Sequence, residues 1–167
     1  MQLLFIHSDY IEYETKEKTK IAEEIADARK NERIEEALVV FIAVERGDAE
    51  HGNYVVEKAA DEISSIVQQV NAERVVLYPY AHLSSELASP EQSIELLRAL
   101  EEDVRSRGIE VTRAPFGWYK SFTLSCKGHP LSELSRKIAV REDLEVKEGE
   151  VERKSKALEA DEKAVSH

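Results

Sequence analysis

The stretch ALVVFIAV, residues 37–44, is the most hydrophobic run of this 167-residue chain. It offers no polar side chain for a solvent-facing side, which is typical of a strand that is covered on both faces. Such a strand needs neighbouring strands and at least one layer of helices around it. The sequence therefore predicts an α/β fold in which residues 37–44 form a central strand.

Two helices are expected to cover this sheet. The apolar residues between 53 and 70 recur with a 3.6-residue period, and Asn53 is in place to be the N-cap of that helix. Ser89 and Pro90 begin a second helix as N-cap and first helical residue, and Gly108 follows its end. We expect a mixed sheet with flanking helices on its outer face.

Other segments complete the expected fold. Residues 3–6 and 10–15 predict two neighbouring strands joined by a tight bend at 7–9. Residues 16–36 are rich in Lys, Glu and Ala with a narrow apolar stripe, which favours a solvated helix. Shorter strands are expected at residues 74–80, 109–113, 122–126 and 133–140.

A composition change marks the end of the expected domain, which covers residues 1–141. Residues 142–167 are rich in charges of both signs and poor in large apolar side chains. Such a segment cannot bury enough surface to offset its ordering entropy, so we interpret it as a charged linker or tail.

Charge and composition exclude several classes of protein. The formal net charge of −11 argues against binding nucleic acid by general attraction to phosphates, which needs a basic surface. One cysteine, Cys126, cannot form an internal disulfide, and the N-terminus does not look like a signal peptide. No apolar run approaches the roughly 18 to 20 residues of a membrane span. We expect a cytoplasmic protein without membrane contact.

Two loops at strand ends are the candidates for chemistry. They are YPYAHLSSELA at 78–88 and APFGWYKSF, a proline-glycine bend, at 114–122. Ligands often bind where strands end, so these loops are expected to converge with His7 and Val44 around one pocket. The sequence has no Gly-rich phosphate loop, Cys/His metal cluster or nucleophile elbow. The groups left for catalysis are His82, Lys120, Tyr119, Glu133 and Asp9.

Each of these residues also has a purely structural interpretation. His82 could cap the helix that follows it, and the aromatic residues of the bend could be core. Lys120 lies among aromatic residues, where a buried ammonium needs Glu133 or the oxygens of a ligand nearby. Alternatively, its stem covers the aromatic rings while the ammonium stays in water. Cys126 is expected to be packing rather than a nucleophile.

Five motifs in order give a more specific indication: LLFIHSDYIEYE, VVFIAVE, YPYAHLSSELA, APFGWYKSF and SCKGHPLSELSR. Over residues 1 to about 141 they closely resemble the N-terminal editing domain of archaeal threonyl-tRNA synthetases. The resemblance implies a D-aminoacyl-tRNA deacylase-like fold. It also implies hydrolysis of L-serine wrongly attached to threonine tRNA, assisted by the 2′-hydroxyl of the tRNA.

The same resemblance implies partners and roles for particular residues. The partners would be the 3′ end of the aminoacylated tRNA, a second copy in a homodimer, and a synthetase catalytic core in cis or in trans, with no cofactor or metal in this domain. The residues expected to bind the substrate are Val44, Ala81, Pro115, Phe116 and Gly117. The residues expected to act on the ester, directly or in support, are Lys120, His82, Tyr119 and Glu133.

Two other functions stay open from the sequence. Stand-alone D-aminoacyl-tRNA deacylases carry a Gly-Pro dipeptide that this chain lacks, but the segment SFTLSC, residues 121–126, is similar to part of their pattern. Clearance of D-amino acids is therefore one alternative. The other is a non-catalytic domain that only dimerises or docks the synthetase.

Overall fold

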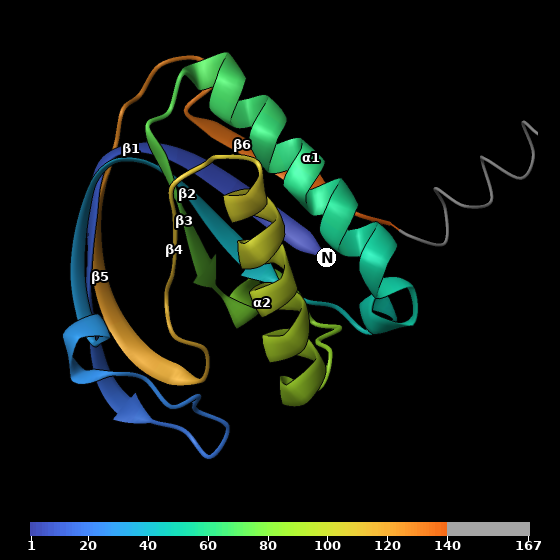
Figure 1. Ribbon diagram of the computed structural model, residues 1–167. Helices are drawn as coiled ribbons and strands as arrows, with labels where there is room; N and C mark the ends of the chain where they lie inside the picture. Colours follow the sequence, from blue (N-terminus) through green and yellow to red (C-terminus); the bar gives the residue numbers. More distant parts are fainter. Residues whose placement is uncertain (140–167) are drawn as a thin grey trace, which may run out of the picture.

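The central element of the structure is the strand that contains the hydrophobic run. The structure is a computed structural model, and residues 1–139 are those that it describes. The strand order is β4-β3-β2-β1-β5, and β6 also pairs with β1 (Figure 1). The strands are β1 (Gln2–Lys18), β2 (Asn31–Ala43), β3 (Arg74–Pro79), β4 (Val111–Arg113), β5 (Trp118–Cys126) and β6 (Glu133–Lys137). Residues 37–44 are all buried, which confirms their predicted central position.

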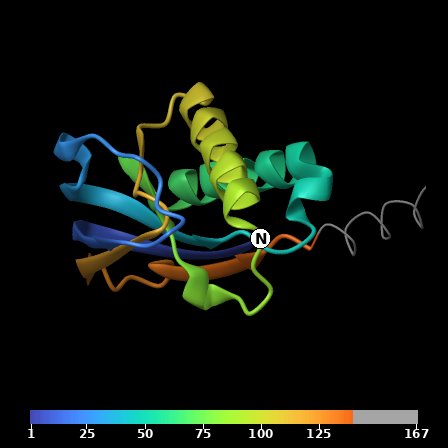
Figure 2. The same ribbon diagram turned by 90° about the horizontal axis from the view of Figure 1, so that it is seen from below.

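The sheet is mixed, as the sequence predicts. β2, β3 and β4 run parallel to one another, whereas β1 is antiparallel to β2, β5 and β6. The parallel strands are joined by α1 (Gly52–Val70) and α2 (Pro90–Ser106), and both helices lie on the same face of the sheet (Figure 2). In the described part of the chain, neither helix is long and apolar enough to cross a membrane.

Apolar residues are buried on both faces of the sheet. Between the sheet and the helices lies a large core, whose members include Leu3, Phe5, Leu38, Val40, Ile42, Val55, Ala59, Ile63, Leu97 and Leu100. On the opposite face lies a smaller core of Ile11, Tyr13, Ile34, Ala37, Val39, Phe41, Val76, Tyr78 and Ala114. Aromatic rings contribute much of this second core and extend from it to the candidate site.

The predicted bend at residues 7–9 is wrong, because β1 continues through it as one strand. Asp9 and Glu36 are skipped in the pairing of β1 with β2, and Glu36 has a φ of 51°. Lys127 binds both carboxylates, with Nζ 2.8 Å from Asp9 and 2.7 Å from Glu36. Beyond this irregularity, odd-numbered side chains of β1 change from the helix-covered core to the opposite one. The register of β1 with β5 also shifts between Ser8 and Tyr10, as at a β-bulge. This bulge and the change of face explain why the sequence pattern resembles a turn.

The helix predicted at residues 16–36 is also wrong. Strand β1 extends to Lys18, and β2 begins at Asn31. Only a short 3₁₀ turn, Asp27–Arg29, lies between them, and Ile21 is exposed. The intrinsic helix propensity of Lys, Glu and Ala is a weak preference, and contacts of this segment with residues 115–118 override it.

The helix boundaries were predicted with mixed success. Ser89 caps α2 as expected, since its Oγ accepts a hydrogen bond from the amide of Gln92 at 3.3 Å. By contrast, α1 begins at Gly52 directly after a 3₁₀ turn, so Asn53 lies inside the helix and is not its N-cap.

The bend predicted at residues 114–122 is shorter than expected. Only residues 114–117 form it, and Trp118 already pairs with Lys18 as the start of β5. The expected linker at residues 142–167 and the domain end at residue 141 lie outside the described residues.

Candidate functional site

A pocket of about 410 Å³ opens where β2 and β3 end, beside the start of β5. Its lining combines aromatic, aliphatic and a few polar side chains, which is the usual make-up of a small-molecule site. The predicted site residues that line it are Val44, Ala81, His82, Phe116, Gly117, Tyr119 and Lys120. The two loops singled out in the sequence therefore do converge, together with the segment around Thr19 and Ile21.

The first loop is held in place by the end of β2. The amide of Ala88 donates to the carbonyl of Val44 at 3.0 Å, and Ser84 Oγ donates to a carboxylate oxygen of Glu45 at 2.7 Å. His82 lies in a short 3₁₀ turn, with its ring centroid 5.2 Å from that of Tyr80. Because Ser89 caps α2, the alternative of His82 as the cap is wrong.

The amine of Lys120 is held by backbone carbonyl oxygens. Its Nζ donates to Pro115 O at 2.8 Å and to Trp118 O at 3.3 Å, and it lies 5.1 Å from the centroid of the Tyr78 ring. Burial lowers the pKa of Lys120 to about 8, although the negative charge of Glu23 acts in the opposite direction. Of the two alternatives that the sequence left open, the structure has the partly buried lysine. The expected partner Glu133 is not beside it, and carbonyls and an aromatic ring take that place.

The bend that supplies these carbonyls depends on glycine. Gly117 has a φ of +80°, and a Cβ at this position would lie 2.6 Å from Ile21 O. The segment that approaches it so closely is bound to the bend: the amide of Thr19 donates to Gly117 O at 3.0 Å, and the amide of Glu23 donates to Phe116 O at 3.0 Å. Gly117 thus allows both the turn and this close packing.

Glu23 is a residue of the site that the sequence analysis missed. Its buried carboxylate forms a bidentate ion pair with Arg113, lies 3.7 Å from Arg98 and accepts a hydrogen bond from the amide of Phe116 at 2.7 Å. Burial alone would raise the pKa of Glu23, but these partners outweigh it and hold the pKa below its usual range. Its helix-like sequence context suggested one more exposed glutamate, so the sequence carried no signal for this role.

Aromatic side chains form one wall of the pocket. Phe122 lies against Phe41 and Tyr78, with ring centroids 5.7 and 5.4 Å apart, although 42% of Phe122 is exposed. Tyr119 is 65% exposed at the rim of the pocket, so its ring is available to a ligand rather than to the core.

Four of the predicted residues, Pro115, Glu133, His7 and Asp9, do not line this pocket. Pro115 contributes only through its carbonyl, which accepts from Lys120. Glu133 pairs with Ile6 of β1, whereas Lys120 pairs with Thr15, nine residues further along the same strand. His7 Nδ1 lies 2.8 Å from His129 Nε2, and Asp9 binds Lys127. Neither histidine lines the pocket.

Metal binding has no support among residues 1–139. No group of three or more His, Cys, Asp or Glu side chains is placed there to hold a metal ion. The polar side chains of the pocket are instead suited to binding oxygen atoms, because the Lys120 ammonium and the His82 imidazole can both donate hydrogen bonds.

Fold and site together define a mixed α/β domain with a largely apolar pocket that is lined by an amine and an imidazole. Residues 1–138 match a family described as the "Archaea-specific editing domain of threonyl-tRNA synthetase". The chain therefore belongs to this family of editing domains.

Curated relatives agree with this assignment. The chain is 54% identical over its whole length to a threonine–tRNA ligase of Methanothrix thermoacetophila, and 51% identical over 98% of its length to that of Thermococcus kodakarensis. A third threonine–tRNA ligase, of Methanosarcina mazei, is 56% identical over 83% of the chain. The chain spans only 22 to 26% of these relatives.

A solved structure supports the fold class alone. The chain is similar to a protein titled c-Myc DNA Unwinding Element Binding Protein, with a TM-score of 0.57 and 11% sequence identity, over 84% of this chain and 100% of that one. The predicted fold class, an α/β domain with a mixed sheet and flanking helices, is confirmed.

Proposed function

We propose that this chain hydrolyses L-serine from threonine tRNA, as the proofreading part of an archaeal threonyl-tRNA synthetase. The observation that carries the proposal is that Lys120 and His82, which come from two loops distant in sequence, both line one pocket of about 410 Å³. Membership of the editing-domain family and similarity to threonine–tRNA ligases point to the same reaction class.

A physical need for a second site supports this substrate. Serine lacks one methyl group of threonine, and a single methyl contributes only about 1–3 kcal/mol to discrimination in a binding pocket. A synthetase that must reject serine more strongly therefore needs to destroy the wrong product. A pocket too narrow for the methyl of threonine would admit the seryl ester and exclude the correct one.

The chemistry that we propose is attack of a water molecule on the ester carbonyl. The backbone at Val44 and Ala81 would bind the seryl amino group, and Pro115, Phe116 and Gly117 would contact the terminal adenosine. The ammonium of Lys120 would then lie near the oxyanion that forms, in a partly dry site where a fixed charge acts strongly.

His82 would orient the water, and Tyr119 at the rim would support the substrate. The ribose 2′-hydroxyl would assist proton transfer as the ester bond breaks, which releases serine and the free tRNA end. With this assistance, the protein itself need not supply a strong general base. Within one chain Glu133 lies away from the site. It would have its expected supporting role only if it reached the site of a second copy in a homodimer.

The partners proposed for this site are few. They are the aminoacylated 3′ end of threonine tRNA, a second copy of the chain, and a synthetase core in cis or in trans. We propose no cofactor or metal for the reaction.

The direct test is a deacylation assay with seryl and threonyl esters of the same threonine tRNA. We expect rapid loss of serine and retention of threonine. Equal loss of both esters, or of neither, would refute the proposal. A D-seryl ester in the same assay separates it from clearance of D-amino acids, because preferential loss of the D-ester would favour that alternative.

Lys120→Met tests the assignment of the amine. We expect the rate of serine release to fall about 100- to 1000-fold, as for loss of a group that stabilises an oxyanion. The thermal midpoint should change little, because methionine fills similar apolar space. Lys58→Met is the matched control, since Lys58 is exposed on α1, away from the pocket. An unchanged rate in Lys120→Met would show that Lys120 has no part in hydrolysis.

A further inference from the structure

We propose that Glu23 is a positioning residue for Lys120, fixing the bend at residues 115–118 whose carbonyl oxygens hold the amine. Its catalytic consequence rests on the proposed hydrolysis, but its structural and electrostatic content can be tested without a substrate. Glu23 does not line the pocket and is not expected to touch the reacting atoms.

Three hydrogen bonds connect Glu23 with the bend. Its carboxylate accepts from the amide of Phe116 at 2.7 Å, its own amide donates to Phe116 O at 3.0 Å, and its carbonyl accepts from Trp118 Nε1 at 2.9 Å. One residue therefore holds the bend on both sides of Gly117, at Phe116 and at Trp118. Pro115 O and Trp118 O, the two acceptors of the Lys120 ammonium, belong to the same short segment.

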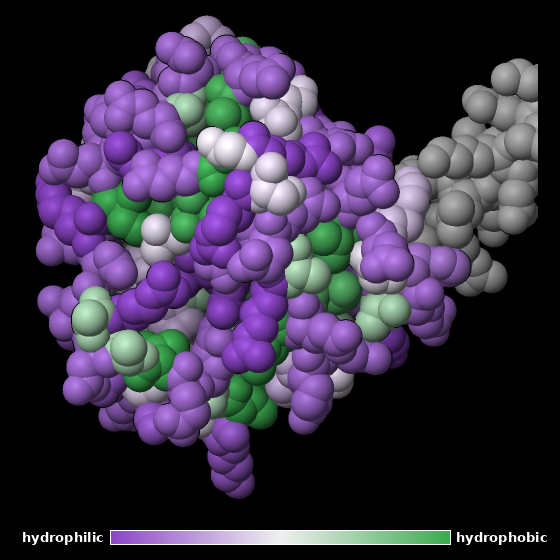
Figure 3. Space-filling view, in the orientation of Figure 1, coloured by the Kyte–Doolittle hydropathy of each residue, from purple (hydrophilic) through white to green (hydrophobic). Residues whose placement is uncertain are grey.

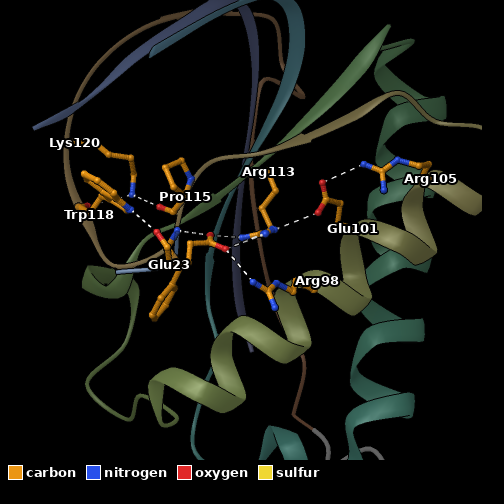
Figure 4. Close-up of polar contacts among 9 residues, drawn as sticks. Glu23, Arg98, Glu101, Arg105, Arg113, Pro115, Trp118 and Lys120 are labelled. Carbon is orange, nitrogen blue, oxygen red and sulfur yellow. Dashed lines mark hydrogen bonds and ion pairs between the residues drawn. The ribbon is translucent and has the colours of Figure 1, made fainter. Parts of the chain in front are cut away.

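The carboxylate is itself fixed from the other side (Figure 4). Arg113 on β4 binds both of its oxygens, and the same guanidinium contacts Glu101 of α2 at 3.2 Å. Arg98 of α2 lies 3.7 Å away. These contacts anchor the bend to the edge strand β4 and to α2. The bend in turn positions the amine of Lys120.

A glutamate at this position also sets the charge around Lys120. A neutral side chain at position 23 could hold the bend, but it would not balance the charge of the largely buried Arg113, whose other carboxylate partner is Glu101. Without the carboxylate of Glu23, Arg113 would keep only Glu101 as a counter-charge, and its less compensated positive charge beside the bend would disfavour the protonated amine. The negative charge of Glu23 raises the pKa of Lys120 against the effect of burial. Glu23 thus helps to keep Lys120 charged near neutral pH, which the proposed chemistry requires.

Glu23→Gln is the main test, because it keeps the shape of the side chain and removes its charge. We expect the pKa of Lys120, measured by NMR on ¹⁵N-labelled protein with Lys120→Met as the assignment reference, to fall. Glu24→Gln is the matched control: Glu24 is the adjacent residue, is exposed, and undergoes the same charge change. A pKa of Lys120 that is unchanged, or that falls no more in Glu23→Gln than in Glu24→Gln, would overturn the proposal.

Kinetics then distinguish positioning from simple stability. We expect kcat for serine release to fall about 10- to 100-fold in Glu23→Gln with KM little changed, as for a displaced catalytic group. The alkaline limb of the pH–rate profile should move to lower pH, and Glu23→Asp should partly restore it. A proportional loss at every pH would indicate only a loss of folded protein and contradict the proposal.

A second pair of variants covers the case in which Glu23→Gln does not fold. Arg98 and Arg105 are both partly exposed cations of α2, but only Arg98 approaches Glu23. Arg98→Gln should raise the pKa of Lys120 more than Arg105→Gln, and equal shifts would overturn the proposal. If the wild-type chain releases no serine, the proposed function fails, while these NMR measurements still decide the role of Glu23.

Discussion

The amine of Lys120 is partly buried, and burial disfavours its positive charge. It has two backbone carbonyls and an aromatic ring as neighbours, and no carboxylate binds it directly among the described residues. Carbonyl dipoles and a ring face stabilise an ammonium less than an ion pair would, so burial determines the direction of its pKa. A lysine poised between charged and neutral forms near pH 8 is typical of a functional site.

This pKa predicts how stability depends on pH. The pKa of Lys120 is lowered to about 8 in the folded state from an ordinary value near 10.5. Between these values the unfolded chain binds a proton that the folded chain does not, so the contribution of Lys120 to the free energy of unfolding increases as pH rises from 8 to 10.5. The gain should be on the order of 2 kcal/mol, because partial solvent access reduces it.

Denaturant unfolding of the wild type and Lys120→Met at several pH values checks this prediction. The difference between the two proteins removes the effects of all other titrating groups. We expect the stability of the wild type to increase relative to the variant above pH 8. A constant difference across this range would mean that the amine is solvated.

The individual residues show which predictions a sequence can support. Lys120 among aromatic residues, and His82 in a loop after a strand, were predictable because their neighbours in sequence also surround them in space. Glu23 was not, since its partners Arg113 and Phe116 lie about 90 residues away and its own neighbours favour a solvated helix. Glu133 was expected close to Lys120, but strand pairing separates the two.

At the scale of elements, the close packing of the bend against residues 19–23 carries the site. Gly117 permits this contact, and Gly108 offers a matched control because it has the same φ of +80° but nothing within 4 Å of a Cβ. Both glycine-to-alanine changes cost about 1–2 kcal/mol for the left-handed backbone. Gly117→Ala should destabilise further, because its Cβ would collide with backbone atoms of Ile21 and Ala22.

Denaturant unfolding and serine release measure this difference. We expect a lower free energy of unfolding in Gly117→Ala than in Gly108→Ala, together with slower hydrolysis in Gly117→Ala only. Equal effects of the two changes would show that the contact between residues 19–23 and the bend is not important.

The success of the predictions also differed between elements. The second helix, α2, was predicted well because its cap and first-turn residues are local signals. The central strand followed from its unbroken apolar pattern. Residues 16–36 failed because their conformation depends on hydrogen bonds to the bend near residue 117, which no local pattern encodes. The bulge in β1 was misinterpreted as a turn for a similar reason: the partner that stabilises it, Lys127, is distant in sequence.

The whole molecule is acidic, with a net charge of −11, and hydrophilic residues dominate the face in Figure 3 with small apolar areas between them. Such a surface gains little from general attraction to phosphates. Recognition by this chain alone should therefore involve the aminoacylated end of the tRNA rather than its helical parts.

Substrate length tests this expectation. We expect the isolated chain to hydrolyse a seryl ester of a short CCA trinucleotide with kcat/KM within about tenfold of that for the intact tRNA, and with a shallow salt dependence. A steep fall of kcat/KM with salt for the intact tRNA, or a much poorer short substrate, would show phosphate contacts that this surface does not suggest.

The central claim is that the pocket between the ends of β2 and β3 and the start of β5 is the site of hydrolysis. A crystal structure of the protein with a non-hydrolysable seryl-adenosine analogue tests it most directly. We predict that the seryl group lies beside Val44, Lys120 and His82, with the adenosine against Phe116 and Gly117. An analogue bound elsewhere on the molecule, or with its seryl group directed away from the Lys120 amine, would contradict the account.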